Sequence, residues 1–281
     1  MELSNINTIQ SILKKHGFSF KKSLGQNFLI NPEVCPKMAE LACDSEMGVL
    51  EIGPGIGVLT KELSKCAKKV VAIELDERLK EILPETLSDC PNVEIIFGDA
   101  MKLNLKEIIT EKFADCSGVA VCANLPYYIT SPIVMMLLES KLPIENITVM
   151  VQKEAAERLC AKVGSREAGA VTVAVSYYAD AEILFPVDRN SFMPPPNVDS
   201  AVIKLNILKN PKVKVMDEKK FFSVVKACFA QRRKTLVNSL SNTANYSKES
   251  IKSALSQINL PETVRSEQLT IEQLAELTNM L

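Results

Sequence analysis

The chain has 281 residues, of which 47% are hydrophobic and 24% charged, and its net charge is −1 at pH 7. No uncharged apolar run of eighteen residues and no apolar leader is present, so we expect a cytoplasmic protein without a membrane span. The eight cysteines lack Cys-x-x-Cys spacing and the only histidine is His16, so we expect reduced thiols, no metal site and no hydrolytic chemistry.

Short β-rich runs alternate with helix-length segments through the first two thirds of the chain. Strands are expected at 48–52, 69–74, 92–97, 119–123 and 147–152. Helices are expected at 58–66 and 76–83, and another helix begins with Ser131 as its cap and Pro132 as its first residue. This alternation predicts a parallel sheet that helices cover on both faces.

The pattern changes after Ala179. Two consecutive strands are expected at 181–187 and 200–208, joined by the proline-rich loop 189–197, and they would add an antiparallel pair at the end of the sheet. Beyond Asn210-Pro211 the sequence is helical, and Thr270 begins a capping box. The sequence therefore predicts an α/β fold: a Rossmann-like domain over 1–208, with 1–30 as an N-terminal lid, and a small all-α domain over 209–281.

A glycine-rich turn, Glu-Ile-Gly-Pro-Gly-Ile-Gly at 51–57, follows the first expected strand. Gly53 and Gly55 would let the backbone approach a ligand closely, and Glu74 at the next strand end could accept hydrogen bonds from ribose hydroxyls. Dinucleotide-binding folds share these features, but their glycine spacing is G-x-G-x-x-G. Glu51 would repel a pyrophosphate and suits a ligand with ammonium and sulfonium groups, and Asp99 could accept from an adenine amino group. The pattern favours S-adenosylmethionine as cofactor.

The segment Asn124-Leu125-Pro126-Tyr127 ends the fourth expected strand, at the edge where open α/β sheets bind ligands. An adenine amino group is a poor nucleophile because its lone pair is delocalised into the ring. The Asn124 side-chain oxygen and the Leu125 carbonyl could accept its N–H bonds, and Tyr127 could stack on the base. Asn124 is not a base, so this chemistry would rest on positioning.

At these residues the chain resembles the ribosomal RNA small-subunit adenine dimethyltransferase family. The resemblance covers nearly the whole chain. It rests on the residues at 23–29, 51–57, 74–76, 98–100, 124–128, 192–200 and 229–234.

The resemblance implies particular roles for residues of this chain. It implies cofactor contacts from Asn27, Leu29, Gly53, Glu74, Asp99 and Asn124. It implies that Asn124, Leu125 and Tyr127 hold the target adenine while Phe192 closes over its other face. It also implies dimethylation of two adjacent adenines near the 3′ end of 16S rRNA, with the small ribosomal subunit as partner. From the residues alone, Phe192 could equally be a hydrophobic plug, and Tyr128 is expected to pack inward.

Nine basic and two acidic residues lie between 209 and 234. If one helix runs through 218–240, Lys219, Lys226 and Arg233 share a stripe that Arg232 flanks. An ordinary solvated face is the alternative, but the local excess of positive charge favours contact with RNA phosphates. Lys21 and Lys22 would extend this contact in an RNA-facing N-terminal segment.

Three other functions remain open at this point. A nicotinamide-dependent oxidoreductase could use the same glycine turn, and a 23S rRNA adenine methylase of the antibiotic-resistance type would share the catalytic motif. A non-catalytic RNA-binding assembly factor could keep the fold. We expect a monomer.

Overall fold

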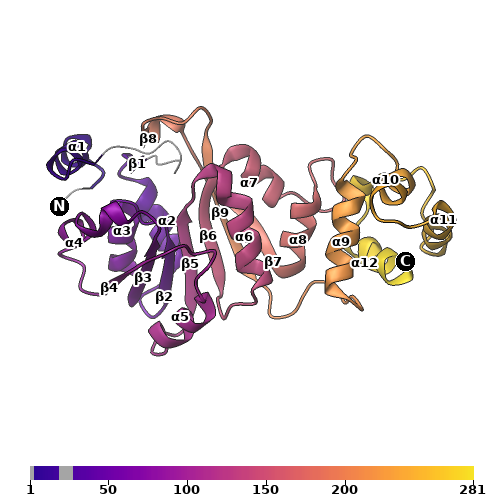
Figure 1. Cartoon of the computed structure of the whole chain (residues 1–281), viewed down its shortest axis with the longest axis horizontal. Helices are drawn as coiled ribbons and strands as arrows, with labels where there is room; N and C mark the ends of the chain where they lie inside the picture. Colours follow the sequence, from indigo (N-terminus) through magenta and orange to yellow (C-terminus); the bar gives the residue numbers. More distant parts are fainter. Residues whose placement is uncertain (1–2, 19–27) are drawn as a thin grey trace. The chain divides into compact units, whose positions relative to one another are not determined.

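The computed structural model describes residues 3–18 and 28–281 of the chain (Figure 1). The protein consists of two compact units, one of residues 1–156 and 182–207 and one of residues 157–181 and 208–281. The domain limits expected from the sequence, 1–208 for the Rossmann-like domain and 209–281 for the helical domain, stay a prediction. No helix in these described ranges is long and apolar enough to cross a membrane.

The first unit is built on a seven-stranded sheet with the strand order β4-β3-β2-β5-β6-β9-β7. Its strands are β2 (Gly48–Ile52), β3 (Lys69–Glu74), β4 (Val93–Phe97), β5 (Val119–Asn124), β6 (Asn146–Gln152), β7 (Ala179–Val187) and β9 (Ser200–Ile207). The pairs among β2 to β6 are parallel, whereas β9 lies antiparallel to β6. The expected parallel sheet with an antiparallel addition at one end is confirmed.

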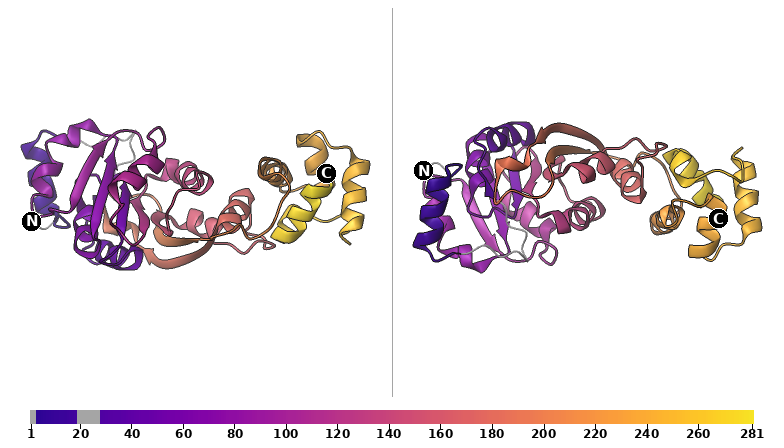
Figure 2. Two further views of the ribbon diagram at one scale, coloured as in Figure 1. Left: turned by 90° about the horizontal axis from the view of Figure 1, so that it is seen from below. Right: turned by 90° about the horizontal axis from the view of Figure 1, so that it is seen from above.

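Helices cover both faces of this sheet (Figure 2). The helices of the unit are α1 (Ile6–Lys15), α2 (Val34–Ala42), α3 (Val58–Cys66), α4 (Leu83–Thr86), α5 (Leu105–Lys112), α6 (Thr130–Glu139) and the start of α7 (Lys153–Leu159). α2 and α3 pack on each other and on the central strands, and they bury apolar side chains such as Met38 and Leu63 there. β2 is buried along its whole length, so its sequence, Gly-Val-Leu-Glu-Ile, does not alternate between polar and apolar residues.

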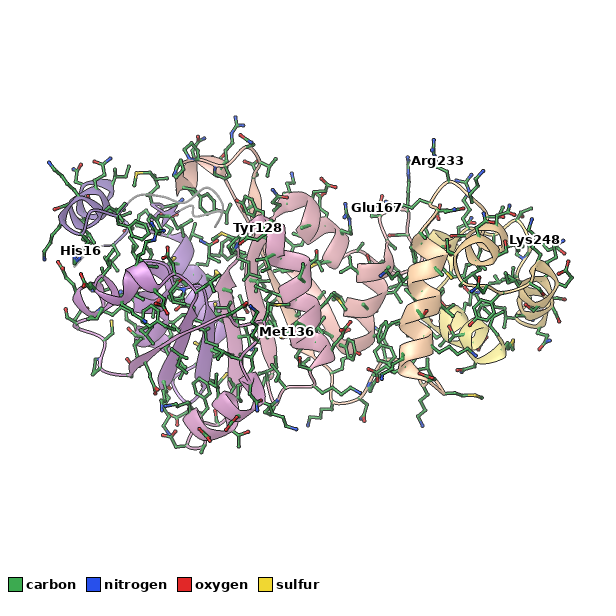
Figure 3. All side chains as sticks on the ribbon, viewed as in Figure 1. His16, Tyr128, Met136, Glu167, Arg233 and Lys248 are labelled. Atoms are coloured by element: carbon green, nitrogen blue, oxygen red, sulfur yellow. The ribbon has the colours of Figure 1, made fainter. Side chains whose placement is uncertain are left out.

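A second cluster of apolar side chains joins α1 to the segment around α4. Ile9, Ile12, Ile82 and Leu83 are members of it. At its edge Glu85 accepts from Lys15 at 2.8 Å and contacts His16, which Figure 3 labels, at 2.9 Å. These contacts attach α1 to the unit.

Two expected helices differ from the sequence prediction. The segment 76–83 forms a 3₁₀ turn, η2 (Glu77–Lys80), and then α4, because Pro84 lacks a backbone N–H and fits only the first turn of a helix. The helix expected to begin at Ser131 begins instead at Thr130, directly after the 3₁₀ turn η3 (Tyr127–Ile129). Ser131 is therefore inside α6 and does not cap it.

A separate two-stranded sheet pairs β1 (Phe28–Leu29) with β8 (Phe192–Met193), which follows η4 (Arg189–Ser191). The strands are antiparallel, and Leu29 lies opposite Phe192. The backbone N–H of Ile30 donates to the Ser191 carbonyl at 2.8 Å and extends the pairing. Two segments far apart in the sequence thus meet beside the main sheet.

The second unit is helical. Its helices are α8 (Ala170–Tyr178), α9 (Glu218–Phe229), α10 (Leu236–Thr243), α11 (Lys248–Gln257) and α12 (Ile271–Met280), with the 3₁₀ turn η5 (Ser266–Gln268) before α12. An aromatic cluster of Tyr177, Tyr178, Phe221 and Phe222 joins α8 to α9, with ring centroids 4.9 to 5.6 Å apart. The capping box predicted at Thr270 is confirmed at the start of α12.

The prediction of one helix through 218–240 is wrong, because α9 ends at Phe229 and α10 begins at Leu236. The Ser239 hydroxyl donates to the Ala227 carbonyl at 2.7 Å, and the Ser266 hydroxyl donates to the Cys228 carbonyl. These tertiary hydrogen bonds satisfy carbonyls at the end of α9, so the helix need not continue.

Candidate active site

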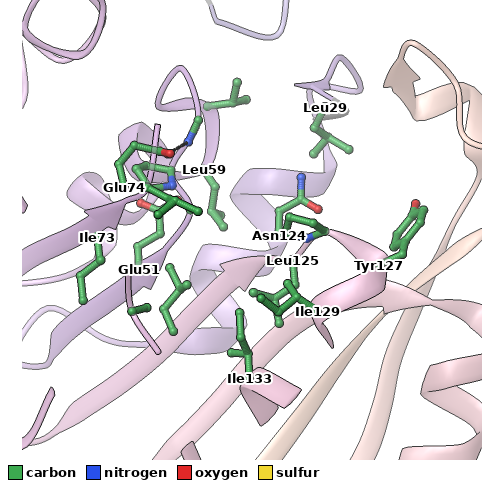
Figure 4. A pocket seen from close by; sticks show the side chains of 18 of the residues that line it. Leu29, Glu51, Leu59, Ile73, Glu74, Asn124, Leu125, Tyr127, Ile129 and Ile133 are labelled. Carbon is green, nitrogen blue, oxygen red and sulfur yellow. Dashed lines mark hydrogen bonds between the residues drawn. The ribbon is translucent and has the colours of Figure 1, made fainter. Parts of the chain in front are cut away.

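One cavity of about 160 Å³ lies at the carboxyl ends of β2, β3, β4 and β5 (Figure 4). Every predicted catalytic and cofactor-binding residue in the described part of the chain lines it. These residues are Leu29, Gly53, Gly55, Glu74, Asp99, Asn124, Leu125, Tyr127 and Phe192. Asn27, the remaining predicted cofactor residue, lies outside the described residues.

The glycine turn after β2 has positive φ angles, which residues with a side chain adopt only with strain. Gly53, Gly55 and Gly57 have φ values of +72°, +58° and +91°. A Cβ atom on Gly55 would also come within 3.3 Å of the Phe28 ring. The sequence therefore needs glycine here both for the turn and for close approach to the pocket.

Glu74 is buried at the end of β3, and both of its oxygens accept backbone N–H groups. Oε2 accepts from Gly55 at 3.1 Å and Oε1 accepts from Asp76 at 2.7 Å. Burial raises the pKa of Glu74, while these two hydrogen bonds favour its charged form. The carboxylate is thus fixed in the pocket with lone pairs left for a ligand's hydroxyl groups.

Arg78 supports this arrangement from outside the pocket, and it was not among the candidates that the sequence indicated. Its Nη2 contacts Asp76 Oδ2 at 2.5 Å, and its Nε donates to Asp76 Oδ1 at 2.8 Å. The Phe18 ring lies against the guanidinium at 4.4 Å. The only signal in the sequence was an arginine two residues after an acid, which is too common to identify a role.

Glu51 supplies a second carboxyl on the same side of the pocket as Glu74 (Figure 4). It is 1% exposed, and its Oε2 atom is buried without a hydrogen-bond partner among the described residues. Burial raises its pKa to about 8 against the opposing effect of the nearby Thr60 hydroxyl, and the Glu74 carboxylate adds to the rise. A cationic ligand would satisfy this oxygen and favour its charged form.

These residues fit S-adenosylmethionine. Glu51 suits its positively charged methionine end, Glu74 suits its ribose, and Asp99 suits its adenine amino group. Asp99 is held by the Met101 N–H, which donates to Oδ1 at 3.0 Å. None of these three acidic side chains offers a positive charge that could compensate a pyrophosphate.

The opposite side of the pocket carries the expected acceptor residues (Figure 4). The half-buried Asn124 side chain makes no hydrogen bond with any residue that the structure describes, so its oxygen and nitrogen are available to a ligand. The Tyr127 hydroxyl lies 2.7 Å from the Ser200 hydroxyl, and burial raises the pKa of Tyr127. Phe192 is 3% exposed and lines the cavity. This position fits both roles considered for it, a residue that covers the base and a hydrophobic plug.

Ser200 is a site residue that sequence reasoning missed as a functional side chain. It is fully buried at the start of β9, and only its pairing with Tyr127 across 73 residues reveals its position. The sequence showed it as the last residue of a motif, without indicating what it contacts.

The expectation that Tyr128 packs inward is wrong. Its side chain, labelled in Figure 3, is 61% exposed, and it lines the same pocket. The reason is η3: this tight turn places Tyr127 toward Ser200 and directs the next residue to solvent.

The predicted RNA-binding residues fall in two places. Lys219 and Lys226 are exposed on α9, whereas Arg232 and Arg233 are exposed in the turn after it, so the seven-residue stripe does not continue to Arg233. Arg232 Nη2 donates to the Arg166 carbonyl at 2.8 Å. We name Lys219, Lys226, Arg232 and Arg233 the basic surface. Lys21 and Lys22 lie outside the described residues.

Comparison with known proteins gives a consistent result. A family model described as ribosomal RNA adenine dimethylase matches residues 17–281. Relatives from Geobacillus sp. (strain WCH70) and Bacillus cytotoxicus, both named ribosomal RNA small subunit methyltransferase A, are each 49% identical to this chain. The first alignment covers 97% of this chain and 95% of the relative, and the second covers 100% and 97%.

Two solved structures are similar over most of the chain. The 23S rRNA methyltransferase ErmE has a TM-score of 0.68 at 30% identity and covers 91% of this chain and 99% of its own. A dimethyladenosine transferase from Plasmodium falciparum has a TM-score of 0.69 at 27% identity, with coverage of 89% and 95%.

Proposed function

The chain belongs to the ribosomal RNA adenine dimethylase family, and we propose that it uses S-adenosylmethionine to dimethylate adenine N6 amino groups in small-subunit ribosomal RNA. One observation carries the proposal: a single cavity joins the carboxylates suited to the cofactor with the Asn124–Tyr127 segment suited to an adenine. The 49% identical relatives are named for the small subunit, whereas the similar 23S enzyme is 30% identical. This difference favours 16S rRNA over 23S rRNA, and the family membership removes the oxidoreductase alternative.

When bound, S-adenosylmethionine supplies a methyl group on a positively charged sulfur. The chain's own part is to present the adenine. We assign the Asn124 side-chain oxygen and the Leu125 carbonyl as acceptors of the N6 hydrogens, which orients the nitrogen lone pair toward the cofactor side. Catalysis then rests on positioning and electrostatics, because Asn124 takes up no proton at neutral pH.

Tyr127 and Phe192 hold the base in this proposal. An adenine must leave its stack before its amino group can enter this cavity, and aromatic faces then replace the lost stacking. The Ser200 hydroxyl fixes the Tyr127 ring through the 2.7 Å contact. Cofactor contacts come from Leu29, Gly53, Gly55, Glu74, Asp99 and Asn124, with Asn27 as a further candidate from the sequence.

The finer points of the proposal come from the family resemblance. The targets would be two adjacent adenines near the 3′ end of 16S rRNA, and the reaction would accompany maturation of the small subunit. The basic surface would contact phosphates and position the RNA without reading its sequence. The protein would act in the cytoplasm as a monomer and without a metal ion.

The test is incubation of unmethylated small subunits with labelled S-adenosylmethionine, followed by mapping of N6,N6-dimethyladenosine. We expect label in two neighbouring adenines of 16S rRNA. Asn124→Ala should lower turnover by about 100-fold or more, the cost of a misplaced reacting group, while RNA association persists. Label in large-subunit RNA alone would favour the resistance-type activity, and an absence of transfer to either RNA would refute the proposal.

A further inference from the structure

Large apolar side chains are exposed together at the rim of the active-site cavity. Leu75, Met101 and Tyr128 are 54%, 40% and 61% exposed, and all three line it. Exposed apolar side chains that gather at one cavity mark a binding surface more reliably than scattered ones. The rim therefore indicates ligand contacts beyond the enclosed part of the pocket.

The three residues divide between the two sides of the site. Leu75 follows Glu74, and Met101 follows Asp99 by two residues, so both adjoin the carboxylates that we assign to the cofactor. Tyr128 instead follows the Asn124–Tyr127 segment that we assign to the adenine. Its exposed ring is thus on the substrate side.

The backbone beneath Tyr128 is well fixed. In η3 the Ile129 N–H donates to the Pro126 carbonyl at 3.1 Å, and the Thr130 hydroxyl donates to the same carbonyl at 3.3 Å. Tyr127 is anchored by Ser200 on the other side. Tyr128 itself makes no hydrogen bond or ring contact with any residue in the described ranges. A hydrogen-bonded turn therefore presents an exposed aromatic ring that has no ring or hydrogen-bond partner among the described residues.

We propose that Tyr128 is a stacking platform for the nucleotide next to the adenine in the pocket. The proposal rests on the proposed function. When one adenine leaves its stack, the neighbouring base loses a stacking partner, and an aromatic ring one residue from Tyr127 can replace it. Stacking on a side chain tolerates any base, so Tyr128 would contribute affinity for single-stranded RNA and no base selection.

The test compares Tyr128→Ala with Tyr128→Phe on unmethylated small subunits. We expect Tyr128→Ala to raise the KM for the subunit by about 5- to 150-fold, the range for loss of one base–aromatic stack, while Kd for S-adenosylmethionine stays unchanged. Tyr128→Phe keeps the aromatic face and should behave like the wild type. Ile183→Ala is a matched control, because Ile183 is 45% exposed on β7 and does not line the cavity.

An RNA fragment with an abasic site next to the methylated adenine gives a second readout. On this fragment Tyr128→Ala and the wild type should have the same KM, because no base is left to stack. The inference is overturned if Tyr128→Ala leaves KM for intact RNA unchanged, or if Tyr128→Phe loses as much as Tyr128→Ala. Failure of the proposed function is a different result, namely a wild-type protein that transfers no methyl group to ribosomal RNA.

Discussion

The buried carboxyl of Glu51 makes cofactor binding dependent on pH. Its pKa of about 8 means that a proton occupies it at neutral pH in the cofactor-free protein. The titratable groups around it are Glu74 and the buried thiols of Cys35 and Cys122, and none of them supplies a positive charge. A ligand with ammonium and sulfonium groups favours the ionised form, so binding should release this proton.

The magnitude follows from the pKa. If only the ionised carboxylate binds, about half of the protein is competent at pH 8 and about one molecule in a hundred at pH 6, so Kd for S-adenosylmethionine should rise by up to about 50-fold between them. Calorimetry at pH 7 in buffers of different ionisation enthalpy should count about 0.9 protons released for each ligand bound. Glu51→Gln cannot ionise, so it should bind S-adenosylmethionine about as weakly as the protonated protein does, and its Kd should follow only the ligand's own titration.

Stability gives an independent check on the same residue. The folded pKa of Glu51 lies above its ordinary value of 4.5, so its contribution to stability is present below pH 4.5 and is lost as pH rises through about 8. The cofactor-free wild type should therefore lose Tm relative to Glu51→Gln across this range. Equal pH profiles for the two proteins, together with no proton release, would refute the reasoning.

Other contacts at the site and on the surface give further predictions. Ser200→Ala should lower kcat/KM by about 2- to 10-fold through loss of one hydrogen bond. Tyr127→Phe removes the same hydrogen bond and should lower kcat/KM equally. In a double-mutant cycle, the double variant should therefore lose no more than either single variant. Arg78→Ala removes the guanidinium that donates to both oxygens of Asp76, so we expect a stability loss of about 1–2 kcal/mol by denaturant titration and a higher Kd for S-adenosylmethionine. Lys226→Glu on the basic surface should weaken RNA binding. The slope of log K for RNA against log salt concentration should fall by the equivalent of about one to two phosphate contacts, while calorimetry gives an unchanged Kd for the cofactor. An unchanged salt slope would contradict the assigned role.

The sequence predicted the parallel sheet well because its strands are buried apolar runs with clear ends. The expected limits 48–52 and 69–74 agree with β2 and β3, and those of 58–66 agree with α3. The residues proposed for the cavity also lie together, since the carboxyl ends of neighbouring parallel strands share one edge of the sheet. Both predictions rest on local sequence patterns, and the parallel topology then places the carboxyl ends of the strands side by side.

Contacts between distant segments were not predictable in this way. The pairing of β1 with β8 involves two residues on each side, which is too short for any periodicity. The end of α9 depends on hydroxyls from later in the chain, and the position of Tyr128 depends on a turn whose geometry a tyrosine pair does not specify. In each case tertiary contacts outweigh local propensity.

The small sheet of β1 and β8 connects two residues that line the pocket. Leu29, assigned to the cofactor, and Phe192, assigned to the base, occupy the same rung of this ladder. In the proposed function, a cofactor that restricts Leu29 should also restrict Phe192 through this pairing, and it should then reduce the entropy that the base loses on binding against Phe192. Such coupling is reciprocal, so each ligand should tighten the binding of the other by the same factor.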